Sequence, residues 1–480
     1  MRLRAFLAWI TFFCAASAVR ANTIPTSIPP DSVAQALLAC PGYSSVRVVS
    51  LLFVGNEKTK EQILRAELDF QEGDTLNATK LARRIELNRR RIFNLQLFHQ
   101  VLVEVVCRNG DLTVLFSVQE RWYTFPVPIL SIADRNFRAW ADRSDKWRRV
   151  DYGLHLTRKN FRGRNEELRG NLQLGFNRKY ELFYEAPGYG RRRRVGVGFG
   201  VSYYKARALD YATVDDRLAT FRPQNGFPIE RRYVTAGLRW RRTVRLLTAF
   251  DVSYHRELIS DSVNLLNPDY YLGRTTREYL DFSLFGVLNQ RNTFAYPLTG
   301  RYAQAQVVYR RFLTNGSPPQ VSLKARYAHY ASLGGNFYYS AATQGQLRFS
   351  RRLSYADNRA LGYDALVRGY DPYVVDGRHY ILLQQGVSYR LFDAGRLQLQ
   401  EIDNPKINSI PLILYLNTFT DAGYVSTPSV VAGNQLPERL LASIGVGLHL
   451  VTYYDRVFTL EYTRNIRGQG GFFLRSEFPI

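Results

Sequence analysis

The sequence predicts a small α+β domain followed by an all-β barrel that crosses a membrane. From Val150 to the C-terminal end, runs of about ten residues alternate apolar side chains with polar or small ones, as the strands of a membrane barrel do. The chain contains 32 Tyr and 29 Phe, yet no interior window holds the roughly 18 consecutive apolar residues of a helical span. A closed barrel is the remaining way to cross a bilayer.

The first 21 residues have the composition of a secretory signal peptide. Arg2 and Arg4 precede an apolar run, and small residues around Ala18 and Ala21 offer cleavage sites. Residues 22–45 follow with four prolines among small polar residues, a composition that favours a tether. We therefore expect folded structure to begin near residue 46.

Residues 46–122 predict a compact α+β domain. Apolar residues alternate in three runs and recur at helical spacing in two others. The predicted elements are a strand over 46–54, helices over 60–68 and after Asn77, and strands over 101–106 and 112–118. Their order is strand, helix, helix, strand, strand.

This order, together with a set of short motifs, resembles a POTRA domain, the periplasmic module that precedes the barrels of outer-membrane assembly factors. The motif residues are Phe53, Gly55, Asn56, Gly73, Phe98 and Glu120. The pattern departs at Gln96, where many members of the family have glycine before the Leu-Phe pair. A sheet of this kind with an exposed edge can accept an extended client segment through backbone hydrogen bonds.

Residues 123–148 begin with aromatic residues and prolines, and we predict that they connect this domain to a barrel over residues 149–480. Fifteen alternating runs can be counted from Val150 onward. Because single-chain bacterial barrels usually have an even number of strands, we place another strand in residues 205–222. The count then puts residues 351–380 after the eleventh strand, on the outer side of the membrane.

Two motifs in the barrel half predict one contact. Residues 351–380 contain Val367, Arg368, Gly369 and Tyr370, and a later run ends with Phe419, Asp421 and Gly423. Counting by twos along that run places Asp421 on the polar face, which points inward in a closed barrel. A bidentate arginine–carboxylate pair fixes both position and orientation, so we expect Arg368 to contact Asp421.

These motifs resemble the C-terminal barrel of the outer-membrane assembly-factor superfamily, the BamA- and TamA-like or bacterial surface antigen D15-type proteins. In that family the arginine loop folds back into the barrel lumen and meets the aspartate of a later strand. Residues 160–164 and 290–300 resemble further family positions. The resemblance implies a 16-stranded transmembrane β-barrel with a single POTRA domain, in the outer membrane of a Gram-negative bacterium with the POTRA domain in the periplasm.

The charge and the histidine and cysteine content argue against nucleic-acid binding, metal binding and catalysis. The formal net charge is +24, but basic residues are spread along the predicted strands rather than gathered in a nucleic-acid-binding module. We therefore expect contacts with outer-membrane lipid or lipopolysaccharide and none with nucleic acid. The six histidines are scattered and no Cys-x-x-Cys occurs, so we predict no metal site, cofactor or catalytic residue. Cys40 and Cys107 could form a disulfide in an oxidising compartment, and the sequence leaves this open.

The function that the resemblance implies is assembly and insertion of outer-membrane proteins, not enzymatic catalysis. In this hypothesis the POTRA domain captures strands of unfolded clients, and the barrel seam, between strands near 150–157 and 471–478, templates their insertion. Accessory periplasmic or lipoprotein subunits are further expected partners. The alternative is a transporter that exports an unfolded substrate through the lumen, as two-partner secretion barrels do. Those barrels usually have two POTRA domains, and only one fits this sequence.

Overall fold

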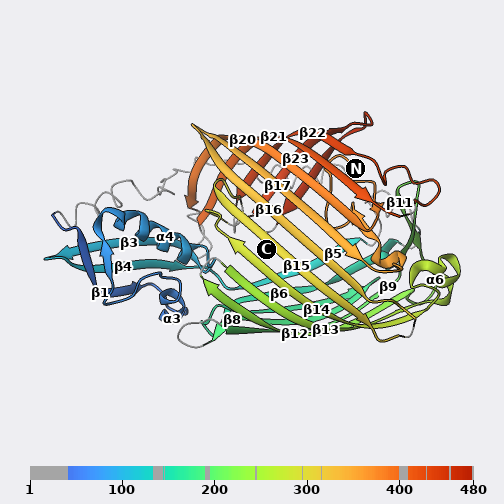
Figure 1. The fold of residues 1–480 in the computed structure, drawn as a ribbon, viewed down its shortest axis with the longest axis horizontal. Coiled ribbons are helices and arrows are strands. Elements are labelled where there is room, and N and C mark those ends of the chain that lie inside the picture. The colour runs from blue at the N-terminus through green and yellow to red at the C-terminus, as the bar shows by residue number, and fades with distance from the viewer. Residues whose placement is uncertain are drawn as a thin grey trace.

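The computed structural model describes residues 42–132, 144, 146–189, 195–243, 246–293, 296–314, 316–398, 409–428, 430–452 and 456–477. The predicted signal peptide, residues 1–21, and most of the predicted tether, residues 22–45, lie outside this part of the chain. Figure 1 shows a small domain beside one end of a large tilted sheet, with helix α6 (Asp261–Leu266) at the other end. In the described part of the chain, no helix is long and apolar enough to cross a membrane.

The N-terminal domain combines two helices with a four-stranded sheet. Its elements are β1 (Ser45–Val54), α3 (Glu61–Arg65), β2 (Thr75–Asn77), η1 (Ala78–Lys80), α4 (Leu81–Phe93), β3 (Phe98–Arg108) and β4 (Asp111–Glu120). The strand order is β2-β1-β4-β3, with β1 parallel to β4 and the other pairs antiparallel. The predicted order of elements is observed, with β2 in addition, because three residues are too few to produce an alternating pattern.

The core of this domain lies between α4 and the sheet. Leu81, Ile85 and Ile92 share one face of α4, since residues four or seven apart align along a helix. All three are buried, as are Val114 and Phe116 on the facing strand β4. This packing leaves the other face of the sheet outside the core, whereas the edge strand β3 contributes Phe98 and Val101 to the core.

Sixteen strands form one antiparallel sheet in which each strand pairs with the next barrel strand along the chain. They are β5 (Thr124–Ile132), β6 (Val150–Phe161), β7 (Glu166–Gly175), β8 (Arg178–Tyr189), β9 (Val195–Ala206), β12 (Ile229–Thr243), β13 (Leu246–Ile259), β14 (Thr276–Asn289), β15 (Gly300–Phe312), β16 (Gln320–Gly334), β17 (Phe337–Phe349), β20 (His379–Gln398), β21 (Ser409–Ser426), β22 (Leu441–Thr452), β23 (Arg456–Asn465) and β24 (Gly470–Glu477). The predicted number of strands is confirmed.

The predicted start of the barrel is wrong. Strand β5 lies inside the predicted connector, residues 123–148, and pairs with β6 along its whole length. Pro126 and Pro128 belong to the run of residues from which the connector is predicted. Proline lacks an N–H to donate, but an edge strand tolerates it, and β5 ends the sheet. The barrel therefore begins at Thr124 rather than at residue 149.

The predicted strand within residues 205–222 is also wrong. This segment forms a separate hairpin of β10 (Leu209–Val214) and β11 (Arg217–Phe221), while β9 pairs directly with β12. Figure 1 places β11 at the end of the barrel far from the N-terminal domain. The two errors cancel in the strand count, so the segment after β17 still follows the eleventh strand, at that same end.

The two faces of the barrel sheet differ in polarity. The outward face exposes large apolar side chains, among them Leu182, Phe199, Val234, Leu284, Leu347, Leu383, Leu448 and Leu460. The inward face carries ion pairs, such as Arg239 with Asp251 and Arg310 with Asp281. An apolar exterior with a polar interior is the pattern of a membrane barrel.

Candidate functional site

The candidate site is built around the loop between β17 and β20, residues 350–378, which we call the inner loop. It contains the short helix η4 (Tyr355–Asp357) and a small ladder of β18 (Arg359–Leu361) and β19 (Val375–Asp376). Side chains of the inner loop bind the barrel wall at two places. The first anchor joins Arg368 to β21 and β23, and the second joins Asp357 to β14 and β15.

The first anchor is the predicted pair of Arg368 and Asp421. The guanidinium donates from Nη2 to Oδ1 of Asp421 at 2.6 Å and from Nε to Oδ2 at 2.9 Å, a bidentate geometry. The backbone N–H of Arg368 donates to the same Oδ2 at 3.1 Å. The Phe419 ring lies against the guanidinium, with its centroid 3.6 Å from Cζ. Because the side chain of Asp421 is fully buried, its charge depends on these donors.

The other motif residues make room for this contact. Gly369 has a φ of +86°, which favours glycine. A Cβ on Gly423 would lie 2.6 Å from Cγ2 of Val367, so a larger residue would push the inner loop away. Val367 and Tyr370 are buried in an apolar cluster between the inner loop and the wall. The structure thus brings all seven motif residues together.

The first anchor includes three residues that the sequence reasoning missed. Glu461 of β23 accepts from Nη1 of Arg368 at 3.2 Å and also from Nη1 of Arg475 on β24. Arg475 in turn donates to Asp371 of the inner loop. Glu461 could have been found from its place on the polar face of an alternating run. Asp371 lies in a loop without periodicity, so no pattern pointed to it.

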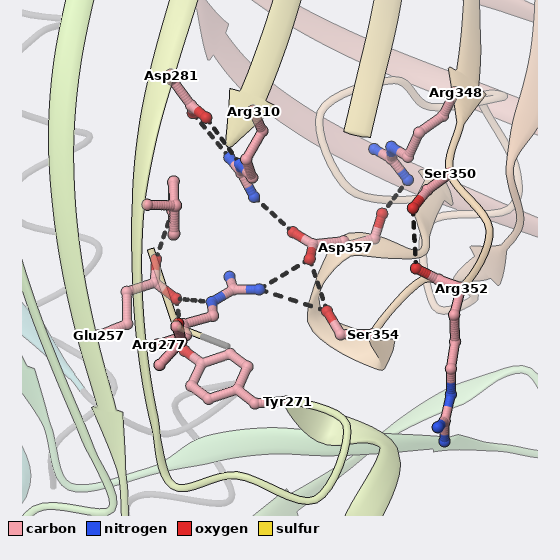
Figure 2. A network of polar contacts seen from close by, with 12 residues as sticks. Glu257, Tyr271, Arg277, Asp281, Arg310, Arg348, Ser350, Arg352, Ser354 and Asp357 are labelled. Atoms are coloured by element: carbon pink, nitrogen blue, oxygen red, sulfur yellow. Dashed lines mark hydrogen bonds and ion pairs between the residues drawn. The ribbon is translucent and has the colours of Figure 1, made fainter. Parts of the chain in front are cut away.

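Figure 2 shows the second anchor, at the root of the inner loop. Asp357 accepts from Nη1 of Arg310 at 2.7 Å, from Nη1 of Arg277 at 2.8 Å and from Oγ of Ser354 at 2.6 Å. Arg348 donates to the backbone carbonyl of Asp357. Burial alone would raise the pKa of Asp357, but the two facing arginines outweigh burial and hold this pKa below its ordinary value.

The second anchor continues into the wall. Arg277 donates from Nε to Glu257 at 2.7 Å, and the hydroxyl of Tyr271 donates to the same carboxylate at 2.6 Å. Arg310 donates from Nε to Asp281 at 2.8 Å (Figure 2). These residues come from β13, β14, β15 and the loop before β14, so no spacing in the sequence predicted that they meet.

Four motif residues of the N-terminal domain support its packing and turns. Phe98 is fully buried, and the Phe53 ring stacks on a ring of β4 with 5.5 Å between centroids. Gly55 and Gly73 have φ values of +88° and +94°, which favour glycine. Gln96 has a φ of +59°, and this left-handed backbone explains why glycine suits the position.

The remaining motif residues, Glu120 and Asn56, bind Thr59, in the short segment of the domain that contacts the barrel. Glu120 accepts from the N–H of Thr59 at 2.7 Å and from its Oγ1 at 2.5 Å, and Asn56 donates to the carbonyl of Thr59 at 3.0 Å. Asn160, near the end of β6, donates to Oγ1 of Thr59 at 2.8 Å. In the β6–β7 turn that follows, the carbonyl of Gly163 accepts the backbone N–H of Lys60 at 2.9 Å.

Two further contacts dock the N-terminal domain against this end of the barrel. Arg241 of β12 forms a bidentate pair with Glu67, whose side chain is buried. Asn94 donates to the carbonyl of Arg291, after β14, at 3.2 Å. The domain is therefore fastened to three separate parts of the barrel rather than linked by one strand alone.

The structure describes only one of the two cysteines of the possible disulfide. Cys107 is disulfide-bonded, and Cys40 lies outside the described residues. In the part of the chain that the structure describes, no group of three or more His, Cys, Asp or Glu side chains is arranged to hold a metal ion.

Comparison with known proteins agrees with this architecture. Residues 46–121 match the POTRA family, described as surface antigen variable number repeat. No curated protein matches the chain. The structure is similar to BamA from Haemophilus ducreyi lacking POTRA domains 1–3, with 14% identity, a TM-score of 0.50, and coverage of 90% of this chain and 84% of that one.

Two CdiB structures are equally similar. CdiB from Acinetobacter baumannii is 16% identical with a TM-score of 0.50, and CdiB from Escherichia coli is 14% identical with a TM-score of 0.52. Each comparison covers 90% of this chain and 74% of the other. The predicted fold, a POTRA domain ahead of a 16-stranded β-barrel, is thereby confirmed.

Proposed function

We propose that this protein assembles and inserts outer-membrane β-barrel proteins, with the POTRA domain capturing client strands and the barrel seam templating their insertion. The observation that carries this proposal is the unpaired edge of the sheet. Within the described residues, the sheet ends at β5 on one side and β24 on the other, and no ladder joins them. The seam therefore lies between β5 and β24, not between the predicted strands near 150–157 and 471–478.

Edge strands present unpaired N–H and C=O groups, which are a template for another strand. The seam edge is also apolar on its outer face, because Phe472 and Leu474 of β24 are 75% and 77% exposed. A client strand that pairs with β24 would meet lipid on the same side as these residues. The unpaired backbone edge and the apolar outer face therefore both favour lateral insertion of a client strand into the bilayer.

The POTRA sheet offers a first binding place for such a strand. Strand β3 ends the sheet: β4 pairs with one of its edges, and along Leu102–Val106 no described strand pairs with the other edge. Leu102 and Val106 are 40% and 55% exposed on the face away from the helices. An extended client can add to this edge through its backbone, with little demand on its side chains. The proposed partners are therefore unfolded barrel proteins, with accessory periplasmic or lipoprotein subunits.

The alternative is a transporter that exports an unfolded substrate through the lumen. A cavity of about 400 Å³ inside the barrel favours it, and Arg326, Tyr330, Arg368 and Glu461 are among the residues that line this cavity. For an extended chain to pass, the inner loop would have to leave its anchors. The likeness to CdiB is as great as the likeness to BamA, so the fold supports both candidates.

Depletion of the protein in its own bacterium separates the two candidates. If it is an assembly factor, several unrelated barrel proteins disappear from the outer membrane and accumulate unfolded in the periplasm. If it is a transporter, one secreted protein stays inside while the other barrels are unaffected. Quantitative proteomics of outer-membrane and periplasmic fractions measures both outcomes, and loss of a single secreted protein would refute the insertion proposal.

A further inference from the structure

Backbone pairing alone gives the last strand little support. Strand β24 has eight residues and pairs with β23 over Val457–Arg464. Its other edge has no neighbouring strand in the described part of the chain. A strand paired on one side only has few hydrogen bonds to fix its register, so side-chain contacts must contribute.

Arg475 makes such contacts from the inward face of β24. Its Nη1 donates to Glu461 of β23, and its Nη2 donates to Asp371 of the inner loop. Asp371 is itself fixed, because its Oδ2 accepts the backbone N–H of Gly369 at 3.0 Å. Gly369 directly follows Arg368, so the first anchor is continuous with the seam strand.

Two more hydrogen bonds tie the β23–β24 turn to the same part of the inner loop. Asn465 donates from Nδ2 to the carbonyl of Gly369 at 2.9 Å. Gln469 donates from Nε2 to the hydroxyl of Tyr373 at 2.8 Å. Residues 368–373 therefore contact both the inward face of β24 and the turn that leads into it.

The charges couple the inner loop to β24. The side chain of Glu461 is only 4% exposed and accepts from both Arg368 and Arg475. If the loop withdrew, Arg475 would keep one carboxylate partner instead of two. If β24 left the sheet, Asp371 would lose its guanidinium partner. Each event therefore makes the other easier, and by thermodynamic linkage the two effects are equal.

We infer that residues 368–373 form a latch on the seam and that Arg475 is the positioning residue through which the inner loop holds β24. One consequence of this inference rests on the proposed function: release of the latch would free the edge of β24 with which a client strand pairs. The contacts that hold β24 in place do not depend on the identity of the client.

Hydrogen–deuterium exchange of the full chain in lipid nanodiscs tests the latch. Asp371→Asn should accelerate exchange of the β24 amides about tenfold, as expected for the loss of one charge-assisted hydrogen bond. Arg475→Gln loses its bonds to both Asp371 and Glu461 and should accelerate exchange at least as much. The double variant should exchange no faster than the faster single variant. Arg464→Gln is the matched control, since it removes an exposed guanidinium from the neighbouring strand β23 and should leave β24 exchange unchanged.

Unchanged β24 exchange in both variants would overturn the latch, and so would equal acceleration in every strand of the barrel. If Arg475→Gln does not fold, Asp371→Asn decides alone, because its substitution lies in the loop. Insertion of a client barrel into the same nanodiscs is measured separately. Faster β24 exchange with normal insertion would support the latch and count against the proposed role of the seam.

Discussion

At the scale of single residues, Asp421 is the most constrained group of the site. Its side chain is fully buried and bound by one arginine from a loop. Removing one partner of a buried ion pair costs about 3–5 kcal/mol, because the other charge is left without a counterion. We expect Arg368→Ala to lower the free energy of unfolding by this order. Asp421→Asn should lower it by less, because Arg368 keeps Glu461 as a counterion at 3.2 Å. The double variant should lose about 1–3 kcal/mol less than the sum of the two losses. Urea unfolding in phospholipid vesicles measures this cycle.

A second pair from the same loop provides the control for this cycle. Lys324 and Asp364 are 3.8 Å apart, with side chains 43% and 90% exposed. Exposed pairs contribute about 0–1 kcal/mol, so Lys324→Ala and Asp364→Asn should have small effects that add within about 0.5 kcal/mol. Additive losses for Arg368 and Asp421 as well would contradict their pairing.

The sequence predicted the Arg368–Asp421 contact because a motif and a strand parity both pointed to it. Asp371 and Arg475 could not be predicted in this way. Asp371 lies in a loop without periodicity, and the contact of Arg475 depends on where that loop turns. The spacing of residues in the sequence does not predict contacts that depend on how a loop folds.

At the scale of elements, the root of the inner loop should respond to pH. The pKa of Asp357 is below its ordinary value because Arg277 and Arg310 face it, although burial acts in the opposite direction. A lowered pKa adds stability above the unfolded value of about 3.9 and loses it as pH falls through the folded value. We expect Asp357→Asn to lower the urea midpoint at pH 7, and the gap from the parent protein to narrow as the pH falls below about 4.

Asp269→Asn is the control for this measurement. Asp269 pairs with Arg352, and the two side chains are 68% and 65% exposed, so this substitution should leave the midpoint nearly unchanged at both pH values. A gap for Asp357→Asn that stays constant between pH 7 and pH 3 would show that the carboxylate charge does not hold the loop root.

The β6–β7 turn should control how firmly the POTRA domain is docked. A Cβ on Gly163 would lie 2.0 Å from the carbonyl oxygen of Lys58, and this atom belongs to the backbone. Overpacking of this kind costs about 1–3 kcal/mol, so Gly163→Ala should loosen the domain. Pulsed electron paramagnetic resonance between one spin label on α4 and one on the barrel should show a broader distance distribution.

Gly335→Ala separates this steric effect from backbone strain. Gly335 also has a positive φ, +55°, but nothing lies within 4 Å of its added Cβ. This variant should leave the distance distribution narrow. Equal broadening in both variants would mean that the β6–β7 turn has no special role in docking.

At the scale of the whole molecule, the alternating runs predicted most of the barrel, because each buried face imposes a period of two. The first strand was missed because Pro126 and Pro128 are tolerated only at an edge, and the sequence does not show where the edge is. The hairpin β10–β11 was mistaken for a membrane strand because an even strand count required one more strand once β5 had been missed. Whether the first and last strands of the sheet pair depends on long-range geometry, and no pattern in the sequence predicts it.

The central claim is that a client strand enters at the seam between β5 and β24. Site-specific photo-crosslinking during the folding of a client barrel tests it most directly. The probe replaces Leu474 on β24, and the control replaces Leu448 on β22, which also faces outward. A third probe replaces Tyr330, which lines the lumen. We predict crosslinks to the client from position 474 and none from 448 or 330. Crosslinks from position 330 without any from 474 would contradict insertion at the seam.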